Sequence, residues 1–314
     1  MAPLQIIVVT GPTASAKTAL GLALAGALGG EIVNFDSVQL YRDFDAGAAK
    51  PTAAEMARVP HHLVAVADAH APWTAGEYAR QARPVIEAVA ARGRMPVLVG
   101  GTGFYLRALI EGLSPAPAAD ERLRERLRRR SDEQLHRLLA RLDPERAARI
   151  AVRDRAKAIR ALEVRLLNGE SMTEQWRQQP PSPWAGVEAL KLGLAPERAA
   201  LYARINRRAA AMFAGPIQEE ACRLLPHYSA ELRIWSSHNY KQALDIVLCG
   251  ADAVAALEEA QLEQRHYAKR QWTWFRADSA VHWLAGFGDD PAIQAEALSW
   301  ARQAMSRGAD RASR

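Results

Sequence analysis

The segment from Gly11 to Thr18 has the composition of a phosphate-binding loop. Its sequence is Gly-Pro-Thr-Ala-Ser-Ala-Lys-Thr, and it lies between an apolar run and a stretch of small apolar residues at helical spacing. In such loops N–H groups at the start of a helix converge on phosphate oxygens, a lysine neutralises the terminal phosphates, and a threonine hydroxyl reaches Mg²⁺. We therefore expect a bound diphosphate or triphosphate, with Mg²⁺ at Thr18; the alternative is a tight strand-to-helix turn without a ligand. The expected phosphate-binding residues are Gly11, Pro12, Thr13, Ala14, Ser15, Ala16, Lys17 and Thr18.

Ala16 is the position at which this loop departs from the phosphate-loop template, which has a second glycine there. If the backbone at this position requires a positive φ, alanine costs about 1–2 kcal/mol. Its methyl group would also lie near the phosphates. Ala16 is therefore the position at which full activity of the loop is most open to test.

Asp36 and Thr102 follow two further apolar runs that we expect to be strands. Asp36 comes directly after Glu31–Phe35, and Thr102 lies in a Val-Gly-Gly-Thr-Gly segment after Met95–Gly100. Ligands of open α/β sheets bind at the carboxyl ends of the strands, so both residues are expected to face the phosphate loop. A carboxylate there can hold Mg²⁺ or act as a base. The alternatives are a turn or helix-cap role for Asp36 and a flexible turn at Gly100–Gly103.

The elements around these residues alternate between strand and helix, which predicts an α/β fold with a parallel, doubly wound sheet. Thr74 is the expected N-cap of one helix, and Glu77 three residues later predicts a capping box. The expected strands are Gln5–Thr10, Glu31–Phe35 and Met95–Gly100, and the expected helices are Lys17–Leu28 and Thr74–Arg92.

A helical insertion is expected from residue 118 to residue 184. Proline-rich linkers flank it at Ser114–Ala119 and Gln178–Pro183, and its helical stretches are Asp120–Arg141, which is rich in arginine, and Asp143–Leu167. The chain is thus expected to have a P-loop core in two parts, residues 1–117 and 185–314. Basic helical faces are most often solvated, so charge alone leaves the role of the insertion open.

The second part of the core is expected to be mostly helical. Val187–Leu194 resembles a returning strand and Val281–Leu284 an edge strand. Between them we expect helices at Glu197–Leu225, at Tyr240–Leu248 and after Asp252, which is suited to an N-cap.

The composition is that of an ordinary globular protein with a basic balance. The 314 residues carry a net charge of +6, which permits a polyanionic partner without requiring one. No apolar run has the length of a membrane span, and no signal peptide is recognised. Cys222 and Cys249 lack metal-ligand spacing and indicate reduced thiols in a cytoplasmic protein. His61-His62 is expected to pack in a loop rather than to form a metal pair.

Taken together, the motifs resemble those of tRNA dimethylallyltransferases, the bacterial tRNA isopentenyltransferase family. The resemblance extends over about residues 4 to 284, with the motifs in the same order along the chain. They are the loop Gly11–Thr18, Asp36-Ser-Val-Gln-Leu-Tyr-Arg42, Gly47-Ala-Ala-Lys-Pro-Thr52, Val59-Pro-His-His-Leu63, Val99-Gly-Gly-Thr-Gly-Phe-Tyr-Leu106, Arg160-Ala-Leu-Glu-Val164 and Tyr267-Ala-Lys-Arg-Gln-Trp-Thr-Trp-Phe-Arg276.

The resemblance implies transfer of a dimethylallyl group from dimethylallyl diphosphate to N6 of the adenosine on the 3′ side of the anticodon. The tRNAs would be those that decode codons beginning with U, and the protein would act as a monomer with Mg²⁺. The phosphate loop would then hold a prenyl diphosphate and no nucleotide need be hydrolysed.

The resemblance also implies roles for individual residues. Asp36 would be the general base, Thr102 would hydrogen-bond near it, and Arg208 would clamp the leaving diphosphate. The tRNA anticodon stem-loop would be contacted by Asp36, Ser37, Val38, Gln39 and Thr102 in the core and by Arg124, Ala156, Lys157, Ala158, Ile159 and Arg160 in the insertion.

Besides Ala16, two segments depart from the family pattern. Asn239 replaces a glycine that usually precedes Tyr-Lys or Tyr-Arg, a mild change because asparagine tolerates left-handed geometry. Gln264 and His266 alter the usual Thr-Arg-Gln before Tyr267, whereas Arg265 is retained.

Three competing hypotheses remain at this stage. The first is a P-loop kinase of a small molecule, and the second is a relative that prenylates free adenine nucleotides. The third is a tRNA-binding protein whose catalysis is impaired by Ala16. The kinase and free-nucleotide hypotheses leave the basic insertion without a use, and the retained Lys17, Asp36 and Arg208 oppose the loss of catalysis.

Overall fold

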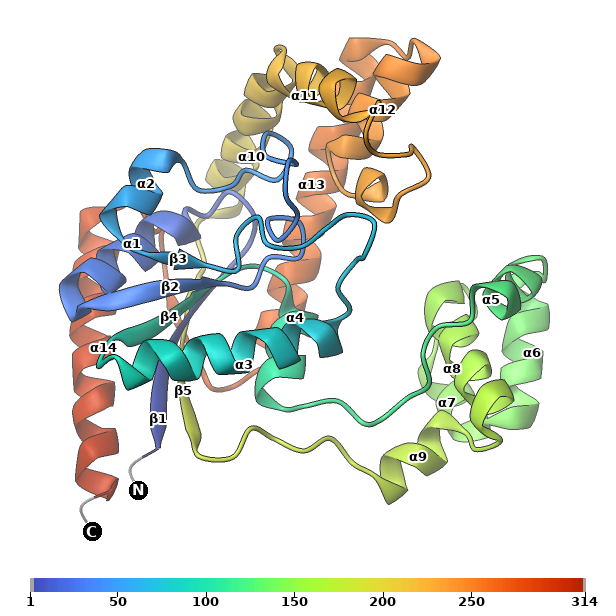
Figure 1. Cartoon of the computed structure of the whole chain (residues 1–314), viewed down its shortest axis with the longest axis horizontal. Coiled ribbons are helices and arrows are strands. Elements are labelled where there is room, and N and C mark those ends of the chain that lie inside the picture. The colour runs from blue at the N-terminus through green and yellow to red at the C-terminus, as the bar shows by residue number, and fades with distance from the viewer. Residues whose placement is uncertain (1–2, 313–314) are drawn as a thin grey trace. The chain divides into compact units, whose positions relative to one another are not determined.

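A six-stranded parallel sheet forms the middle of the larger of two units in the computed structural model, which describes residues 3–312 (Figure 1). The strand order is β3-β2-β4-β1-β5-β6, and every neighbouring pair is parallel. The predicted α/β fold with a parallel P-loop-type core is confirmed. The strands are β1 (Leu4–Thr10), β2 (Gly30–Asn34), β3 (His61–His62), β4 (Met95–Val99), β5 (Val187–Leu194) and β6 (Val281–Leu284).

Helices cover both faces of this sheet, which explains why its strands are near-continuous apolar runs. On one face α1 (Lys17–Leu28) and α14 (Pro291–Ala312) pack on the strands, and alternate β1 residues such as Ile7 and Val9 point into that layer. On the other face lie α3 (Ala75–Ala91) and α4 (Gly103–Ile110), which pack on each other. The layers bring the loops after β1, β2 and β4 to one edge of the sheet (Figure 1).

The cap of α3 is simpler than predicted. Thr74 accepts a hydrogen bond from the Glu77 N–H, as expected for an N-cap. The Glu77 carboxylate, however, bonds Arg80 and Gln81 instead of returning to the backbone of Thr74. Only half of the capping box is therefore present.

The segment predicted as one helix from Glu197 to Leu225 is two helices, so that prediction is wrong. They are α10 (Arg198–Phe213) and α11 (Pro216–Leu224). Gly215 between them has a φ of 149°, and the following proline has no N–H to continue the ladder. The break turns the chain toward α12 (Tyr240–Cys249), preceded by the 3₁₀ turn η1 (Arg233–Ser236).

The long helix α13 (Ala253–Arg276) packs on α10 and α12 and passes beneath the strand ends. It begins after Asp252, whose side chain accepts a hydrogen bond from the Ala255 N–H, as predicted. A short helix, α2 (Ala53–Arg58), precedes β3. The two histidines of β3 stay structural: His61 bonds the Val59 carbonyl, and His62 bonds Glu31.

The smaller unit spans Glu111–Trp184 and is entirely helical. It starts at Glu111 instead of residue 118, because α4 ends at Ile110. Buried Glu163 anchors it by accepting hydrogen bonds from Arg124, Arg160 and the Asp120 N–H. Its helices are α5 (Glu121–Arg128), α6 (Asp132–Leu142), α7 (Pro144–Arg149), α8 (Arg155–Asn168) and α9 (Met172–Gln178).

No helix in the described part of the chain is both long and apolar enough to cross a membrane. Cys222 and Cys249 are both free and exposed.

Candidate active site

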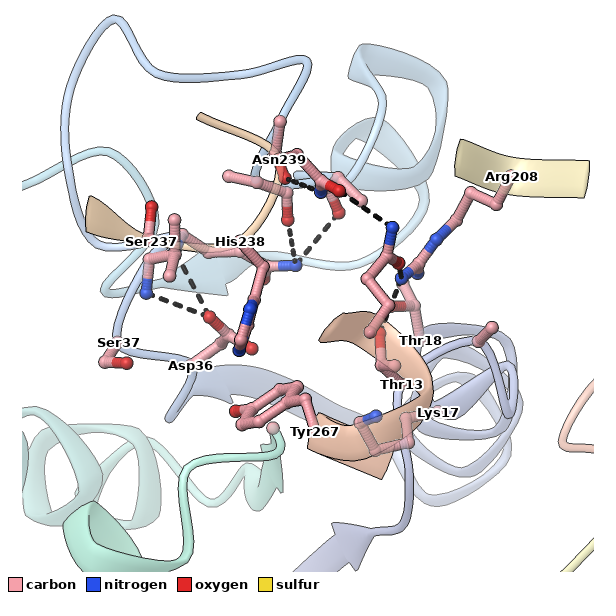
Figure 2. Close-up of a pocket in the computed structure, with 18 of the residues that line it drawn as sticks. Thr13, Lys17, Thr18, Asp36, Ser37, Arg208, Ser237, His238, Asn239 and Tyr267 are labelled. Carbon is pink, nitrogen blue, oxygen red and sulfur yellow. Dashed lines mark hydrogen bonds between the residues drawn. The ribbon is translucent and has the colours of Figure 1, made fainter. Parts of the chain in front are cut away.

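A cavity of about 310 Å³ opens at the carboxyl ends of β1 and β2 (Figure 2). Its walls come from segments far apart in the sequence. They are Thr13–Thr18, Asp36–Gln39, Gly47–Ala49, Val99–Gly100, Arg208, Ser237–Asn239, Gln264 and Tyr267, of which all but Ser15 line the cavity. In Figure 2 the side chains of Lys17 and Arg208 lie on one side of the cavity and those of Asp36 and Ser37 on the other.

The predicted phosphate loop connects β1 to α1, and its backbone is strained at two alanines. Ala14 and Ala16 have φ values of 62° and 64°, and Ala16 is the left-handed N-cap of α1. The positive φ considered for Ala16 is thus present, with the alanine cost of about 1–2 kcal/mol. Gly11 has a φ of 146°, and a Cβ there would lie 3.0 Å from the Leu194 Cβ. The loop therefore keeps the shape of a phosphate cradle without its second glycine.

Two cations meet beside this loop. The pKa of Lys17 is lowered to about 8, chiefly by burial; Asp36 acts to raise it and Arg208 acts to lower it. Burial also lowers the pKa of Arg208. The Arg208 guanidinium donates from Nη2 to the Thr13 hydroxyl, and its buried Nε has no hydrogen-bond partner among the described residues. Two partly desolvated cations with one carboxylate across the cavity form a site that an anion would complete.

Asp36 shapes a turn and also lines the cavity. Its Oδ1 accepts hydrogen bonds from the N–H groups of Val38 at 2.9 Å and Gln39 at 3.4 Å, so it shapes the turn after β2. It also lines the cavity and acts by its charge on Lys17 and Arg208. Its Oδ2 has no hydrogen-bond partner in residues 3–312. That oxygen is the one available to a ligand.

Thr102 acts on the cavity through Ser37 and does not itself line it. The Thr102 hydroxyl accepts from the Ser37 N–H at 3.0 Å and bonds the Ser37 Oγ at 3.2 Å. The glycines around it permit close approach rather than flexibility. A Cβ at Gly100 would lie 2.6 Å from the Phe35 backbone, and one at Gly103 2.2 Å from Trp274.

Known proteins resemble this chain over most of its length. The sequence matches the model of the IPP transferase family over residues 39–278 and that of isopentenyl transferase over residues 4–64. A tRNA dimethylallyltransferase of Koribacter versatilis (strain Ellin345) is 51% identical over 300 residues, covering 93% of this chain and 96% of the relative. The chain belongs to the IPP transferase family.

Further relatives of this IPP transferase agree in sequence and fold. A tRNA dimethylallyltransferase of Solibacter usitatus (strain Ellin6076) is 44% identical, covering 94% of this chain and 97% of the relative. The crystal structure of a full-length tRNA isopentenylpyrophosphate transferase from Bacillus halodurans is 32% identical with a TM-score of 0.74, covering 99% of this chain and 100% of that one.

Gln271 supports the phosphate loop of this IPP transferase from outside the cavity lining, and sequence analysis did not single it out. Its Oε1 accepts from the Thr13 N–H at 2.7 Å, and its Nε2 donates to the Gly101 carbonyl at 2.9 Å. It thereby fixes the phosphate loop to the loop after β4. Its burial explains why the amide needs these partners, and a glutamine within a helix does not reveal that burial in the sequence.

Gly47–Ala49 form another wall that sequence reasoning did not place in the site, and the preceding Asp45 and Ala46 hold it in position. Buried Glu220 accepts from the Asp45 and Ala46 N–H groups, both at 2.9 Å, and from the Tyr240 hydroxyl. The Gly47 N–H donates to that hydroxyl at 3.2 Å. A Cβ at Gly47 would lie 2.6 Å from the Tyr240 ring, so glycine is required there.

Tyr267 and His238 also line the cavity. Their rings lie 4.8 Å apart. Burial and the neighbouring Asp36 raise the pKa of Tyr267, and burial lowers the pKa of His238. Both side chains thus favour their neutral forms next to the carboxylate.

Asn239 departs further from ordinary backbone geometry than expected. Its φ of 73° with a ψ of −44° lies outside the left-handed helical region that asparagine tolerates. Such backbone conformations cost on the order of 1–3 kcal/mol and persist where the surroundings hold them. The replacement of glycine at this position is therefore not mild.

The residues expected to contact tRNA from the smaller unit differ in exposure. Ala158 and Ile159 are buried in its core, so their side chains are not available to a ligand. Arg124 and Arg160 are half-buried and pair with Glu163. Ala156 and Lys157 are exposed, and Lys157 bonds Asp154.

Proposed function

We propose that this IPP transferase transfers a dimethylallyl group from dimethylallyl diphosphate to N6 of the adenosine on the 3′ side of the anticodon, in tRNAs that decode codons beginning with U. The observation that carries the proposal is a cavity with two partly buried cations, Lys17 and Arg208, facing a carboxylate, Asp36. Relatives over nearly the whole chain are named tRNA dimethylallyltransferase.

The diphosphate would bind at the phosphate loop. Ionisation of an allylic diphosphate leaves negative charge on the departing oxygens, and fixed cations stabilise that charge as it develops. Lys17 and Arg208 line the cavity and are held in place by hydrogen bonds to the Pro12 carbonyl and the Thr13 hydroxyl. Because both are already partly desolvated, they need little reorganisation when the leaving group forms.

The acceptor adenine would lie across the cavity, next to Asp36. An exocyclic amine is a weak nucleophile, so its placement and a nearby base contribute most of the catalysis on this side. The Oδ2 atom of Asp36 would take the N6 proton, while Oδ1 stays bonded to the turn. Thr102 would hold Ser37 in position for the base. An anticodon-loop adenosine has to leave its stack to reach this cavity.

Mg²⁺ fits the donors of the cavity. The described residues contain no cluster of three or more His, Cys, Asp or Glu side chains, as a fully protein-bound cation would need. Mg²⁺ more often keeps several waters and joins substrate phosphates to one or two protein oxygens. The Thr18 hydroxyl lines the cavity and would supply such an oxygen. Bound there, the ion would neutralise diphosphate charge.

The smaller unit would grip the anticodon stem. Phosphate contacts from lysine and arginine depend on salt and carry no sequence information. Lys157 is the exposed cation among the residues expected here. Arg124 and Arg160 are ion-paired with Glu163, and the exposed parts of their guanidinium groups would contribute as well. We expect tRNA affinity to fall steeply with ionic strength.

The competing hypotheses have less support. A small-molecule kinase leaves the expected use of the smaller unit unexplained, as does a prenyltransferase of free nucleotides. A binding protein impaired by Ala16 would have a distorted loop, yet Lys17 and Thr18 line the cavity beside a positive-φ Ala16.

The direct test is incubation with unmodified tRNA, Mg²⁺ and labelled dimethylallyl diphosphate. We expect label in the RNA, at N6 of the adenosine after the anticodon when the RNA is digested. Absence of label with tRNA binding intact would overturn the proposal in favour of a binding protein. Label transfer from γ-labelled ATP to a small metabolite would instead favour a kinase, and prenylation of free AMP with no label in tRNA would favour a nucleotide prenyltransferase.

A further inference from the structure

Two of the residues at which the sequence departs from the family pattern, Asn239 and Gln264, are bonded to each other. The Gln264 Nε2 donates to the Asn239 Oδ1 at 2.7 Å, although the residues belong to different elements. Only 4% of Asn239 and 2% of Gln264 is exposed to solvent. Both line the cavity, and Figure 2 shows Asn239 there. Two buried amides in contact are costly unless their remaining groups are also satisfied.

The remaining groups extend this bond into a chain across the cavity. At one end Arg208 donates from Nη2 to the Gln264 Oε1 at 3.0 Å, and the same Nη2 donates to the Thr13 hydroxyl. At the other end the Asn239 Nδ2 donates to the Gly47 carbonyl at 3.1 Å. The chain of bonds therefore connects the phosphate loop to the loop at Gly47.

Chemistry fixes the direction of every bond in this chain. A guanidinium only donates and a backbone carbonyl only accepts. Gln264 must therefore turn its oxygen to Arg208 and its NH₂ to Asn239, which in turn must present its oxygen to Gln264 and its NH₂ to Gly47. Flipping either amide would place two donors or two acceptors against each other.

The backbone of Asn239 supports a specific use of this side chain. The residue keeps a φ of 73° and a ψ of −44°, a conformation in which glycine would be free of strain. An asparagine there retains the strain and adds three side-chain contacts, to Gly47, Gln264 and the Met212 sulfur. Strained residues of this kind concentrate at functional sites.

We propose that Gln264 and Asn239 are a pair of positioning residues that hold Arg208 on the phosphate loop in the orientation needed to bind the diphosphate. This rests on the proposed binding of a diphosphate at that loop. Thr13 and Gln264 together occupy Nη2, and the buried Nε has no hydrogen-bond partner among the described residues. The other guanidinium N–H groups therefore remain for the ligand. Gln264 is itself oriented by Asn239, which is held by the Gly47 carbonyl.

Gln264 and Asn239 each depart from the family pattern, and each side chain needs the other as a hydrogen-bond partner. Glycine at position 239 would remove the acceptor of the Gln264 Nε2 and the donor to Gly47. A shorter side chain at position 264 would leave the Asn239 Oδ1 and the Arg208 Nη2 with one partner fewer. The effects of the two substitutions on diphosphate binding are therefore expected to be far from additive.

The test is binding of inorganic diphosphate to the full-length chain, measured by calorimetry without any turnover. Gln264→Leu is expected to weaken binding about tenfold, the loss expected when a hydrogen bond to a charged group is removed. The matched control is Gln261→Leu on the same helix, because Gln261 bonds the Asn206 carbonyl and has no hydrogen bond to Arg208. The control should bind diphosphate as the unchanged chain does.

Two further variants separate positioning from a general structural role. Asn239→Gly removes the side chain and relieves the backbone, so it should weaken diphosphate binding while the melting temperature stays equal or rises. In an Arg208→Ala background Gln264→Leu should cause no additional loss. In steady state, Gln264→Leu should raise KM for dimethylallyl diphosphate more than it lowers kcat, with tRNA affinity unchanged.

The inference is overturned if Gln264→Leu and Asn239→Gly both bind diphosphate as the unchanged chain does, or if the loss from Gln264→Leu persists without Arg208. If Gln264→Leu does not fold, Asn239→Gly alone decides the question. An unchanged chain that binds diphosphate but adds no label to tRNA would sink the proposed function and leave this inference standing. An unchanged chain that binds no diphosphate would sink the inference itself.

Discussion

On the phosphate side of the cavity, defined as Thr13–Thr18 with Arg208, one continuous segment supplies nearly all of the groups. On the acceptor side, defined as Asp36–Gln39, Gly47–Ala49 and Ser237–Asn239, the groups come from three segments. The phosphate side contains strained alanines and an unsatisfied Arg208 Nε. The polar groups of the acceptor side are largely paired within the protein.

The difference indicates which side has polar groups that only a ligand would satisfy. Lys17 and Arg208 lose hydration on folding, and Asp36 is the opposite charge that acts on both, so an anion bound on the phosphate side would offset the cost of their burial. The acceptor side has its shape before any ligand arrives, because Thr102 holds Ser37 and Tyr240 holds Gly47. Substitutions on the two sides should therefore affect different steps.

The largest effect is expected for Asp36→Asn on the acceptor side. The amide oxygen can still accept from the Val38 N–H, so the turn after β2 should survive. Loss of the base should lower kcat by about 10²- to 10⁴-fold. Single-turnover transfer of labelled prenyl groups would measure this, with tRNA affinity measured in parallel. Turnover that persists while tRNA affinity falls would show that Asp36 binds tRNA and is not the base.

The next largest effect is expected for Arg208→Ala on the phosphate side. Removing a cation that stabilises the leaving group should lower kcat/KM for dimethylallyl diphosphate about 10²-fold. The matched control is Arg207→Ala, since Arg207 is the exposed neighbour on α10. Equal losses in the two variants would mean that Arg208 acts only through the general charge of the helix.

A smaller effect should appear in the dependence of diphosphate binding on pH. The pKa of Lys17 is lowered to about 8, so the ammonium is lost from the free protein as pH rises past that value. Diphosphate affinity should be level below pH 8 and fall above it, which calorimetry across the range would measure. Lys17→Arg should remove the break, because arginine stays protonated. A break that survives Lys17→Arg belongs to another group.

The lowered pKa of Lys17 also affects the stability of the ligand-free protein, which should rise with pH where diphosphate affinity falls. Between about pH 8 and the ordinary lysine pKa of 10.5, the unfolded chain binds more protons at Lys17 than the folded chain does. The contribution of Lys17 to the free energy of unfolding therefore rises with pH in that window. Saturating diphosphate should remove this rise, because the anion restores the preference for the charged lysine.

The two sides also differ in how much of them could be predicted from sequence. The phosphate loop, its positive φ at position 16 and the placement of Asp36 after β2 follow from contiguous residues and from the rule for strand ends. The bond from Thr13 to Gln271 joins residues 258 positions apart, and no local pattern contains it. The same holds for the Gly47 wall and its support by Glu220.

Sequence reasoning was also incomplete where a side chain has two uses. Asp36 was expected to be either a turn residue or a site residue. Its Oδ1 shapes the turn while the carboxylate also lines the cavity, which a side chain with two oxygens allows. The glycines beside Thr102 allowed a flexible turn, whereas close contacts with Phe35 and Trp274 require them. Partners distant in sequence decided the case of the glycines.

The smallest effect is expected for Ala16→Gly, and its sign tests whether strain on the phosphate side has a function. Glycine adopts a φ of 64° without a Cβ penalty, so the free energy of unfolding should rise by about 1 kcal/mol. The control Ala23→Gly, within α1, should lower it by about 0.5–1 kcal/mol, because glycine costs entropy in a helix. Urea unfolding would measure both, alongside transfer activity. We expect Ala16→Gly to be at least as active as the unchanged chain, since the cations and Asp36 do not depend on the methyl group. A more stable but much less active variant would show that the phosphate side is adapted to its alanine.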